Sequence, residues 1–262
     1  MVCFMNLGAP CRCGGSRTPP PYARTSMTDV VKTNGRRLAR VVRHVALRAH
    51  SRSTWRSDLR QLVEREPSPK LQIGCGPNPL PGWFNTDFYL FSAGVHFLDA
   101  TKPLPFPDGS FMYVLTEHQI EHITIGQAQR MLRECVRIMR PGGRIRIATP
   151  SLEFITGLKR AVLSSDEERY VQFASNFLDP TLGLRTPAVA VNSIFYEHGH
   201  RFIYDFETLA HVLQQAGFAD VRRCASGESE CPELRGIDNH AIACGSEVFN
   251  RLETLVVEAL RP

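Results

Sequence analysis

The residues best placed to do chemistry lie between positions 70 and 122, where a glycine turn is followed by acids at intervals. A short apolar run, Lys70–Ile73, leads directly into Gly74-Cys75-Gly76. Glycine lets the backbone approach a ligand that a Cβ would push away. Asp87 and Asp99 follow, each where a further strand should end. Ligands bind at the carboxyl ends of strands in open α/β sheets, so this order predicts a nucleotide-like cofactor.

The connection after the glycine turn argues against a dinucleotide. Pro77, Pro79 and Pro81 interrupt the stretch in which a dinucleotide would need a helix N-terminus for its pyrophosphate. Asp87 follows Gly74 by 13 residues, whereas the dinucleotide pattern places its acid about 20 residues on. S-adenosylmethionine (SAM) carries no phosphate and tolerates a short connection broken by prolines. The loop therefore favours SAM over NAD.

The two acids have distinct expected roles. A carboxylate at Asp87 can accept both ribose hydroxyls, and one at Asp99 can accept the adenine amino group. The predicted cofactor residues are Gln72, Gly74, Cys75, Gly76, Asn78, Asp87, Asp99, Ala100, Thr116 and Glu117.

His118 is the first candidate for catalysis, because it lies just past an expected strand over 111–116. A neutral imidazole there suits removal of a hydroxyl proton or orientation of an acceptor. His118-Gln-Ile-Glu-His122 also matches an inverted zinc-peptidase motif. That reading needs both histidines on one helix face, and here the motif straddles a strand-to-helix connection. Helix capping and packing remain the plain explanation for Glu121 and His122.

Two later groups are expected to complete the site. Tyr196-Glu197-His198-Gly199-His200 follows a predicted insertion and should form a roof. We predict His198 and His200 as the second choice for catalysis. The predicted substrate residues are Tyr196, Glu197, Asp238 and His240. No metal-ligand set stands out, and a Mg²⁺ requirement through the acids and histidines is left open.

Strands and helices alternate along the rest of the chain, which predicts a mostly parallel sheet. The expected strands are 70–73, 83–87, 94–98, 111–116, 144–148, 219–224 and 254–260. A helix is expected over 126–139, and another should begin after Asp205 and end at Gly217. A helical insertion fills about 151–200.

Residues 68–262 resemble the class I SAM-dependent methyltransferases, in particular the small bacterial "type 11" kind. The matching segments are Leu71–Gly76, Asn85–Asp87, Asp99-Ala100, Leu104–Phe111, Glu121-His122, Leu132–Gly143, His200–Tyr204 and Ala216–Phe218. The resemblance implies a Rossmann-like, seven-stranded sheet with helices on both faces and an insertion after strand five. It also implies SAM as the cofactor. Gln72 and Met112 stand where the family carries acids.

Basic residues are concentrated in the N-terminal part of the sequence. Residues 1–66 hold 13 Lys and Arg against 4 Asp and Glu, while residues 67–262 hold 18 against 22. We predict a disordered leader over 1–27, a basic helical arm over 28–66 and the SAM-binding domain over 67–262. An apolar stripe in the arm should dock on the main domain; its residues are Leu38, Val41, Val42, Val45 and Ala49.

Composition excludes several classes. No apolar run approaches the roughly 18 residues of a membrane span. The eight cysteines contain no CxxC pair, which indicates reduced thiols and a cytoplasmic protein. No nucleic-acid partner is expected, since the basic charge lies in an arm with few aromatic residues. A homodimer is left open.

The expected function is O-methylation of a small hydroxylated acceptor. Histidines, acids and amides dominate the candidate acceptor site, which suits a sugar or oligosaccharide better than a flat aromatic molecule. The nearest resemblance is to actinobacterial methyltransferases of sugar and polysaccharide biosynthesis. N- or C-methylation of another metabolite, or of a lipid or quinone precursor, is the alternative enzyme. A SAM-binding regulatory or scaffold protein is the alternative outside enzymes.

Overall fold

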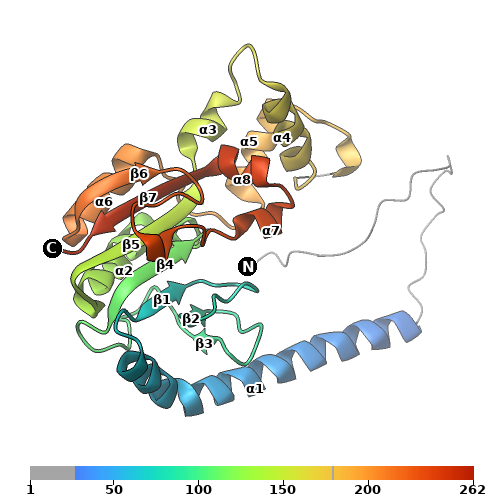
Figure 1. Ribbon diagram of the computed structural model, residues 1–262. Helices are drawn as coiled ribbons and strands as arrows, with labels where there is room; N and C mark the ends of the chain where they lie inside the picture. The colour runs from blue at the N-terminus through green and yellow to red at the C-terminus, as the bar shows by residue number, and fades with distance from the viewer. Residues whose placement is uncertain (1–26, 179) are drawn as a thin grey trace.

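Seven strands form one sheet in the order β3-β2-β1-β4-β5-β7-β6 in the computed structural model, which describes residues 27–178 and 180–262 (Figure 1). The strands are β1 Lys70–Ile73, β2 Phe84–Asp87, β3 His96–Phe97, β4 Phe111–Glu117, β5 Met139–Pro150, β6 Ala219–Cys224 and β7 Thr254–Leu260. Neighbouring strands from β3 to β5 are parallel, and β7 is antiparallel to β5 and β6. The predicted class I fold is confirmed. The chain order reverses between β1 and β4, where ligands bind in such sheets.

Eight α-helices lie in the described part of the chain. They are α1 Met27–Arg65, α2 Ile125–Ile138, α3 Leu152–Gly157, α4 Ser165–Ser175, α5 Pro187–Tyr196, α6 Phe206–Ala216, α7 His240–Cys244 and α8 Glu247–Glu253. A 3₁₀ turn, η1, spans Ile120–His122. The sequence analysis missed α7 and α8, which are too short to show a helical period. The signal for α8 was its cap, because Ser246 Oγ accepts from the Phe249 N–H.

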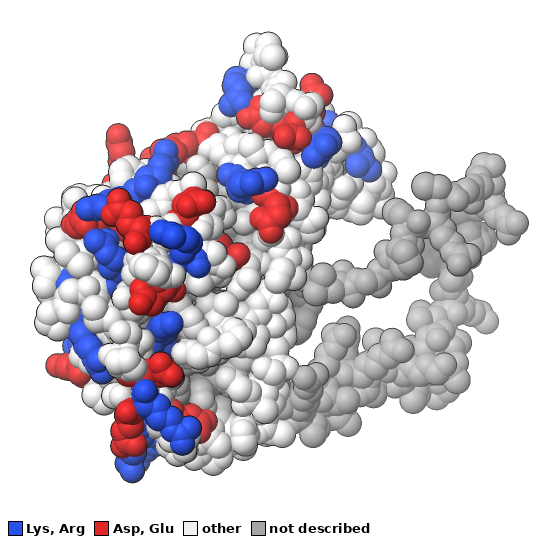
Figure 2. Space-filling model, viewed as in Figure 1, with Lys and Arg blue, Asp and Glu red and all other residues white. Residues whose placement is uncertain are grey.

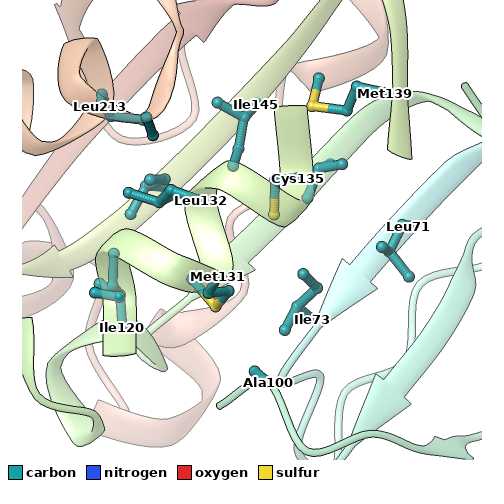
Figure 3. Close-up of a cluster of buried hydrophobic side chains, with 14 of the residues drawn as sticks. Leu71, Ile73, Ala100, Ile120, Met131, Leu132, Cys135, Met139, Ile145 and Leu213 are labelled. Atoms are coloured by element: carbon teal, nitrogen blue, oxygen red, sulfur yellow. The ribbon is translucent and has the colours of Figure 1, made fainter. Parts of the chain in front are cut away.

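Helix α2 forms where it does because its start is capped and one face is apolar. Thr124 and Gln127 make a reciprocal capping box at its N-terminus. Met131, Leu132 and Cys135 lie on the buried face and pack toward β1 and β5 (Figure 3). Helix α6 packs beside it on the same core. As predicted, Asp205 caps α6 and Gly217, with φ 110°, ends it.

The docking face of α1 differs from the predicted stripe. Val45 is 61% exposed and Ala49 is also exposed, while the side chains of Leu38, Val41 and Val42 lie outside the described residues. The contacts come from the following turns instead. Trp55 stacks on Phe106 with ring centroids 5.0 Å apart and meets the edge of Phe84. Ser51 Oγ accepts the Phe97 N–H of β3.

For Val45 and Ala49 the predicted docking is wrong, because helical periodicity shows that an apolar face exists, not which turns lie over the sheet. The last turns of α1 contribute Leu59, Leu62 and Val63 to the main hydrophobic core. The leader predicted over 1–27 lies outside the described residues, Met27 excepted.

The insertion after β5 builds a separate hydrophobic cluster. Helices α3, α4 and α5 pack around Tyr170, together with Phe249 of α8 (Figure 1). The cluster places His198 and His200, which follow α5, beside the central strands.

Arg146 of β5 is fully buried and charged. Its Nη1 donates to Glu258 Oε1 of β7 at 2.6 Å, and its Nε and Nη2 donate to the two oxygens of Asp238 at 2.8 and 2.5 Å. All three side chains are nearly inaccessible to solvent. The guanidinium fork therefore joins β5 and β7 to the segment that follows β6.

The surface charges are mixed. On the described part of the face in Figure 2, Lys and Arg alternate with Asp and Glu, without one continuous basic patch. Within residues 27–178 and 180–262, no helix combines the length and the apolar character that crossing a membrane requires.

Replacing Arg146 by Met should destabilise the fold strongly, because two buried carboxylates would lose their shared counter-charge. We expect a loss of about 3–5 kcal/mol in the free energy of unfolding, measured by urea denaturation. Arg144→Met is the matched control, since Arg144 pairs with Asp220 near the surface and should cost at most about 1 kcal/mol. Equal losses for the two variants would contradict a special role for the buried group.

Candidate cofactor and acceptor site

The glycine turn after β1 is held against β2 by its own backbone. The N–H groups of Gly74 and Cys75 both donate to the Thr86 carbonyl, at 2.9 and 3.0 Å. Gly74 has φ 76° and Gly76 has φ 54°, a region that other residues adopt only with strain. A Cβ added to Gly76 would meet nothing within 4 Å. The turn thus leaves open space beside Gly76.

Asp87 ends β2 beside that space, and two backbone donors hold its carboxylate. Oδ2 accepts the Gly76 N–H at 2.8 Å, and Oδ1 accepts the Tyr89 N–H at 2.6 Å. Burial raises the pKa of the Asp87 carboxyl, against the opposing effect of these N–H groups and of His122. Each oxygen keeps a lone pair, so the fixed carboxylate can still accept ribose hydroxyls.

Asp99 follows β3 and is half-buried. Its Oδ1 accepts both the N–H and the hydroxyl of Thr101, at 3.0 and 2.6 Å. Ala100, next to it, is buried in the main core. These contacts orient the Asp99 carboxylate, and its Oδ2 is the atom that suits an adenine amino group.

The Gln72 side chain forms hydrogen bonds with the backbone of the loop that contains Asn78 and Leu80. The Gln72 side chain is buried in β1; its Oε1 accepts the Leu80 N–H at 3.1 Å and its Nε2 donates to the Asn78 carbonyl at 3.5 Å. Gln72, predicted as a cofactor residue, therefore has hydrogen-bond partners within the loop. Cys75 is buried, and burial raises the pKa of its thiol to about 12, so it lines the turn as a neutral group.

Gln119 is a site residue that the sequence analysis missed. Its Oε1 accepts the Thr116 hydroxyl at 3.1 Å, and its Cγ lies 2.5 Å from the point where a Cβ on Gly74 would stand. The side chain therefore spans from the end of β4 to the glycine turn of β1. Nothing local in the sequence indicates this contact, because 45 positions separate Gly74 from Gln119.

Glu117 clamps the segment after β6 to the end of β4. Its Oε1 accepts the N–H groups of Asn239 and His240 at 2.8 and 3.0 Å, and its Oε2 also approaches the Asn239 N–H at 3.1 Å. The carboxylate predicted for the cofactor thus has backbone partners of its own. Its clamp brings His240 over β4.

His118 is held on both ring nitrogens and on one face. Nδ1 lies 3.3 Å from Glu121 Oε1, and Nε2 lies 3.3 Å from Thr254 Oγ1. Because Thr254 donates its own proton to Asn250, its oxygen accepts from His118 Nε2–H. Burial lowers the pKa of His118, but Glu121 outweighs it and the pKa lies above the usual value. The network therefore favours the protonated, imidazolium form of His118. The His118 backbone itself lies in the left-handed region, with φ 46°.

His240 stacks on the His118 ring, with centroids 3.4 Å apart and planes 15° from parallel. Its Nε2 lies 2.8 Å from Glu253 Oε1, and Tyr170 donates its hydroxyl to the same carboxylate. Burial lowers the pKa of His240, and the positive charge of His118 adds to that. His240 is thus a neutral imidazole whose Nε2–H points to Glu253 and whose Nδ1 carries the lone pair.

The histidines predicted for the roof lie against His122. The His122 and His200 rings lie 5.0 Å apart, and those of His198 and His200 lie 5.5 Å apart. Glu121 stands between these rings and His118. Burial lowers the pKa of His200 to about 4 and also lowers that of His198. Five histidines from three separated segments therefore share one site with Glu121.

Three of the predicted substrate residues, Tyr196, Glu197 and Asp238, do not join this group of histidines. Tyr196 is 73% exposed at the end of α5, and Glu197 caps that helix. Asp238 is 2% exposed, with both carboxylate oxygens on Arg146 and Oδ2 also on the Gly227 N–H. Asp238 thus positions the 225–240 segment.

The chemistry of these groups is compatible with SAM. The space beside Gly76 is open, and Asp87 and Asp99 offer carboxylate oxygens of the kind that accept ribose hydroxyls and an adenine amino group. The histidines and Glu121 gather next to the end of β4.

Comparison with known proteins supports this reading. Residues 91–147 match the family model of a methyltransferase domain. The chain is 28% identical over 120 residues to the ubiquinone/menaquinone biosynthesis C-methyltransferase UbiE of Salmonella arizonae. That match covers 46% of this chain and 43% of the relative, so the chain spans less than half the length of the curated relatives it matches.

Solved structures of similar fold include a SAM-dependent methyltransferase of Archaeoglobus fulgidus. It is 20% identical, with a TM-score of 0.43 over 80% of this chain and 94% of that one. A possible histamine N-methyltransferase of Thermotoga maritima is 18% identical, with a TM-score of 0.41 over 85% and 96%. Likeness at this level carries no argument about the acceptor. The chain thus combines the strand order of the class I fold with a match to a methyltransferase domain over residues 91–147.

Asp87→Ala should weaken SAM binding by roughly tenfold to a hundredfold, because the ribose would lose its charged acceptor. Titration calorimetry with SAM and with S-adenosylhomocysteine measures the loss. Asp166→Ala is the control, since Asp166 lies exposed on α4 beside Arg169 and should leave affinity unchanged. SAM affinity that survives the Asp87 substitution would refute its assignment.

Gly74→Ala should destabilise the protein more than Gly76→Ala. Both positions have positive φ, which costs a residue with a Cβ about 1–2 kcal/mol, but only at Gly74 does the Cβ also meet Gln119. Because Gln119 Cβ also lies 2.7 Å from that point, only glycine at position 119 removes the clash. Adding Gly74→Ala to a Gln119→Gly variant should therefore cost no more than Gly76→Ala costs the parent, as urea denaturation would show. Equal stability of the two alanine variants would mean that Gln119 moves away freely.

Proposed function

We propose that this methyltransferase transfers the methyl group of SAM to a hydroxyl of a small polar acceptor, such as a sugar or oligosaccharide. The observation that carries the proposal is the joined group of histidines and glutamates beside the cofactor residues. Imidazoles and carboxylates donate to and accept from hydroxyl groups, and a sugar presents several of them.

Asp87 and Asp99 hold the nucleoside, and the glycine turn leaves room for the rest of the cofactor. When bound, SAM supplies an electrophilic methyl group on a positively charged sulfur. The protein must then align the acceptor oxygen with that methyl group and give the hydroxyl proton a destination.

His240 suits the second of these tasks. With its Nε2–H on Glu253, it keeps a lone pair on Nδ1 that can take the proton. The carboxylate-histidine arrangement fixes the tautomer of the base. His118, whose two ring nitrogens are held by Glu121 and Thr254, supports the His240 ring by stacking on it. We thus propose His240 as base and His118 as the residue that positions it, with His198 and His200 lining the acceptor side.

A C-methyltransferase acting on a quinone or lipid precursor is the second candidate. The match to the C-methyltransferase of ubiquinone and menaquinone biosynthesis favours it. It would need an apolar acceptor surface, and Phe177, which meets His198 edge-on with centroids 5.0 Å apart, is the aromatic group nearest to that role.

Labelled SAM decides between the acceptors. We expect label from the methyl group to enter a pool of sugars and glycosides and to leave a demethylated isoprenoid quinone unlabelled. The opposite pattern would establish the second candidate and reject the first.

His240→Ala should lower kcat by about 10²–10⁴ while SAM affinity stays within about twofold. His118→Ala should lower kcat to a smaller extent, because it removes the ring on which the proposed base stacks. His211→Ala, exposed on α6, is the control and should match the parent enzyme. Full turnover by His240→Ala would remove the base from that residue.

A further inference from the structure

Glu121, His122 and His200 form a compact set of possible metal ligands, which we call the EHH cluster. One ligand atom from each residue lies within 4.8 Å of the others. Glu121 and His122 stand on the 3₁₀ turn η1, while His200 follows α5. The backbone joins the two parts directly, because the Glu121 carbonyl accepts the Arg201 N–H at 2.6 Å.

The Glu121 carboxylate lies at the centre of the cluster. Its side chain is fully buried, and its Oε2 accepts the Thr149 hydroxyl at 3.0 Å. Its Oε1 has a long ion-pair contact with His118 Nδ1, at 3.3 Å, and no aligned hydrogen bond from a described residue. His122 Nε2 lies 4.0 Å from the same oxygen. Oε1 therefore keeps a lone pair that can bind a cation beside the two histidines.

His200 is already arranged as a metal ligand. Its Nδ1 donates to the Ile194 carbonyl at 2.5 Å. That bond fixes the tautomer and leaves the Nε2 lone pair free, as is usual for histidines that bind metals. His122 is 41% exposed, so the cluster is open on one side.

We propose that Glu121, His122 and His200 bind one Zn²⁺ ion. Two imidazoles and one carboxylate are a three-ligand set that zinc uses when its fourth position holds water or substrate. The nitrogen ligands favour zinc over Mg²⁺, which prefers oxygen. The ligand atoms need to close by about an ångström to reach zinc–ligand distances of about 2.0–2.2 Å.

The site differs from the zinc-peptidase reading of His118-Gln-Ile-Glu-His122. His118 precedes η1 in a left-handed conformation, and so the two histidines of that motif do not share a helix face. Instead, His118 would hold Glu121 from outside the ligand set. The third ligand comes from His200, 78 positions after His122.

The other set of possible ligands, His240, Cys244 and Glu253, is less suited. The His240 Nε2–H and the Tyr170 hydroxyl already satisfy Glu253. The Cys244 thiol donates to the Ser246 carbonyl at 3.2 Å. An ion there would have to break these bonds.

The test is direct metal binding by the full chain without an affinity tag and without SAM or acceptor, so its result is independent of the methylation proposal. After chelator treatment and dialysis, Zn²⁺ is titrated by calorimetry, and Co²⁺ replaces it for visible spectroscopy. We expect one ion per chain and tetrahedral cobalt bands. His122→Ala and His200→Ala should each lower zinc affinity by about a hundredfold or more, and His211→Ala should not change it.

Because His122 is partly exposed, its substitution tests the site without removing a buried group, and circular dichroism checks the fold. Absence of stoichiometric binding would overturn the proposal, as would unchanged affinity in both histidine variants. A thiolate-to-cobalt band that disappears in Cys244→Ser, or in Cys11→Ser/Cys13→Ser, would place the ion elsewhere and overturn it as well.

Discussion

The guanidinium of Arg146, on β5, forms ion pairs with Glu258 on β7 and with Asp238 in the segment after β6. A buried cation of this kind is tolerated only where acids surround it, so the three chain segments must meet in one register. Asp238 is followed by Asn239 and His240, whose N–H groups donate to Glu117 at the end of β4. The ion pair and the clamp together bring His240 onto His118.

The cofactor side depends on a different constraint, the meeting of parallel strands at one edge. β1, β2 and β4 end beside one another, and their backbone groups hold the residues that follow. Thr86 accepts the N–H groups of the glycine turn, while Gly76 donates to Asp87. Thr116 reaches the turn through Gln119. Hydrogen bonds thus hold in place the residues proposed to bind the nucleoside.

The acceptor side concentrates ionisable groups in a poorly solvated place. Glu121 and Glu253 are the anions, and each has a histidine against it, His118 and His240 respectively. The two stacked rings share one face and cannot both be charged without repulsion. One imidazolium beside one neutral imidazole is the arrangement that this geometry favours. Such a pair keeps a proton acceptor, His240, fixed against the His118 ring.

The strands and the turn around the proposed cofactor residues could be predicted from the sequence, because their signals are local. The strand Lys70–Ile73 and the turn at Gly74 each occupy a few consecutive residues. The same holds for each short strand and the acid that ends it. The caps of α2 and α6 are local as well. Gln72 could be assigned to the loop or to the cofactor, and only the structure shows its bond to the loop.

Only the tertiary structure shows which partners the acids near the proposed acceptor site have. Asp238 and Glu117 looked like ligand-binding acids, yet their partners are Arg146 and the 239–240 backbone, which lie 92 and over 120 positions away. The same holds for Gln119 on Gly74 and for the turns of α1 that reach Phe106. Sequence patterns determine which residues are polar, capped or apolar on one face. Which buried charge meets which partner depends on the crossing of distant strands, and no local pattern records that.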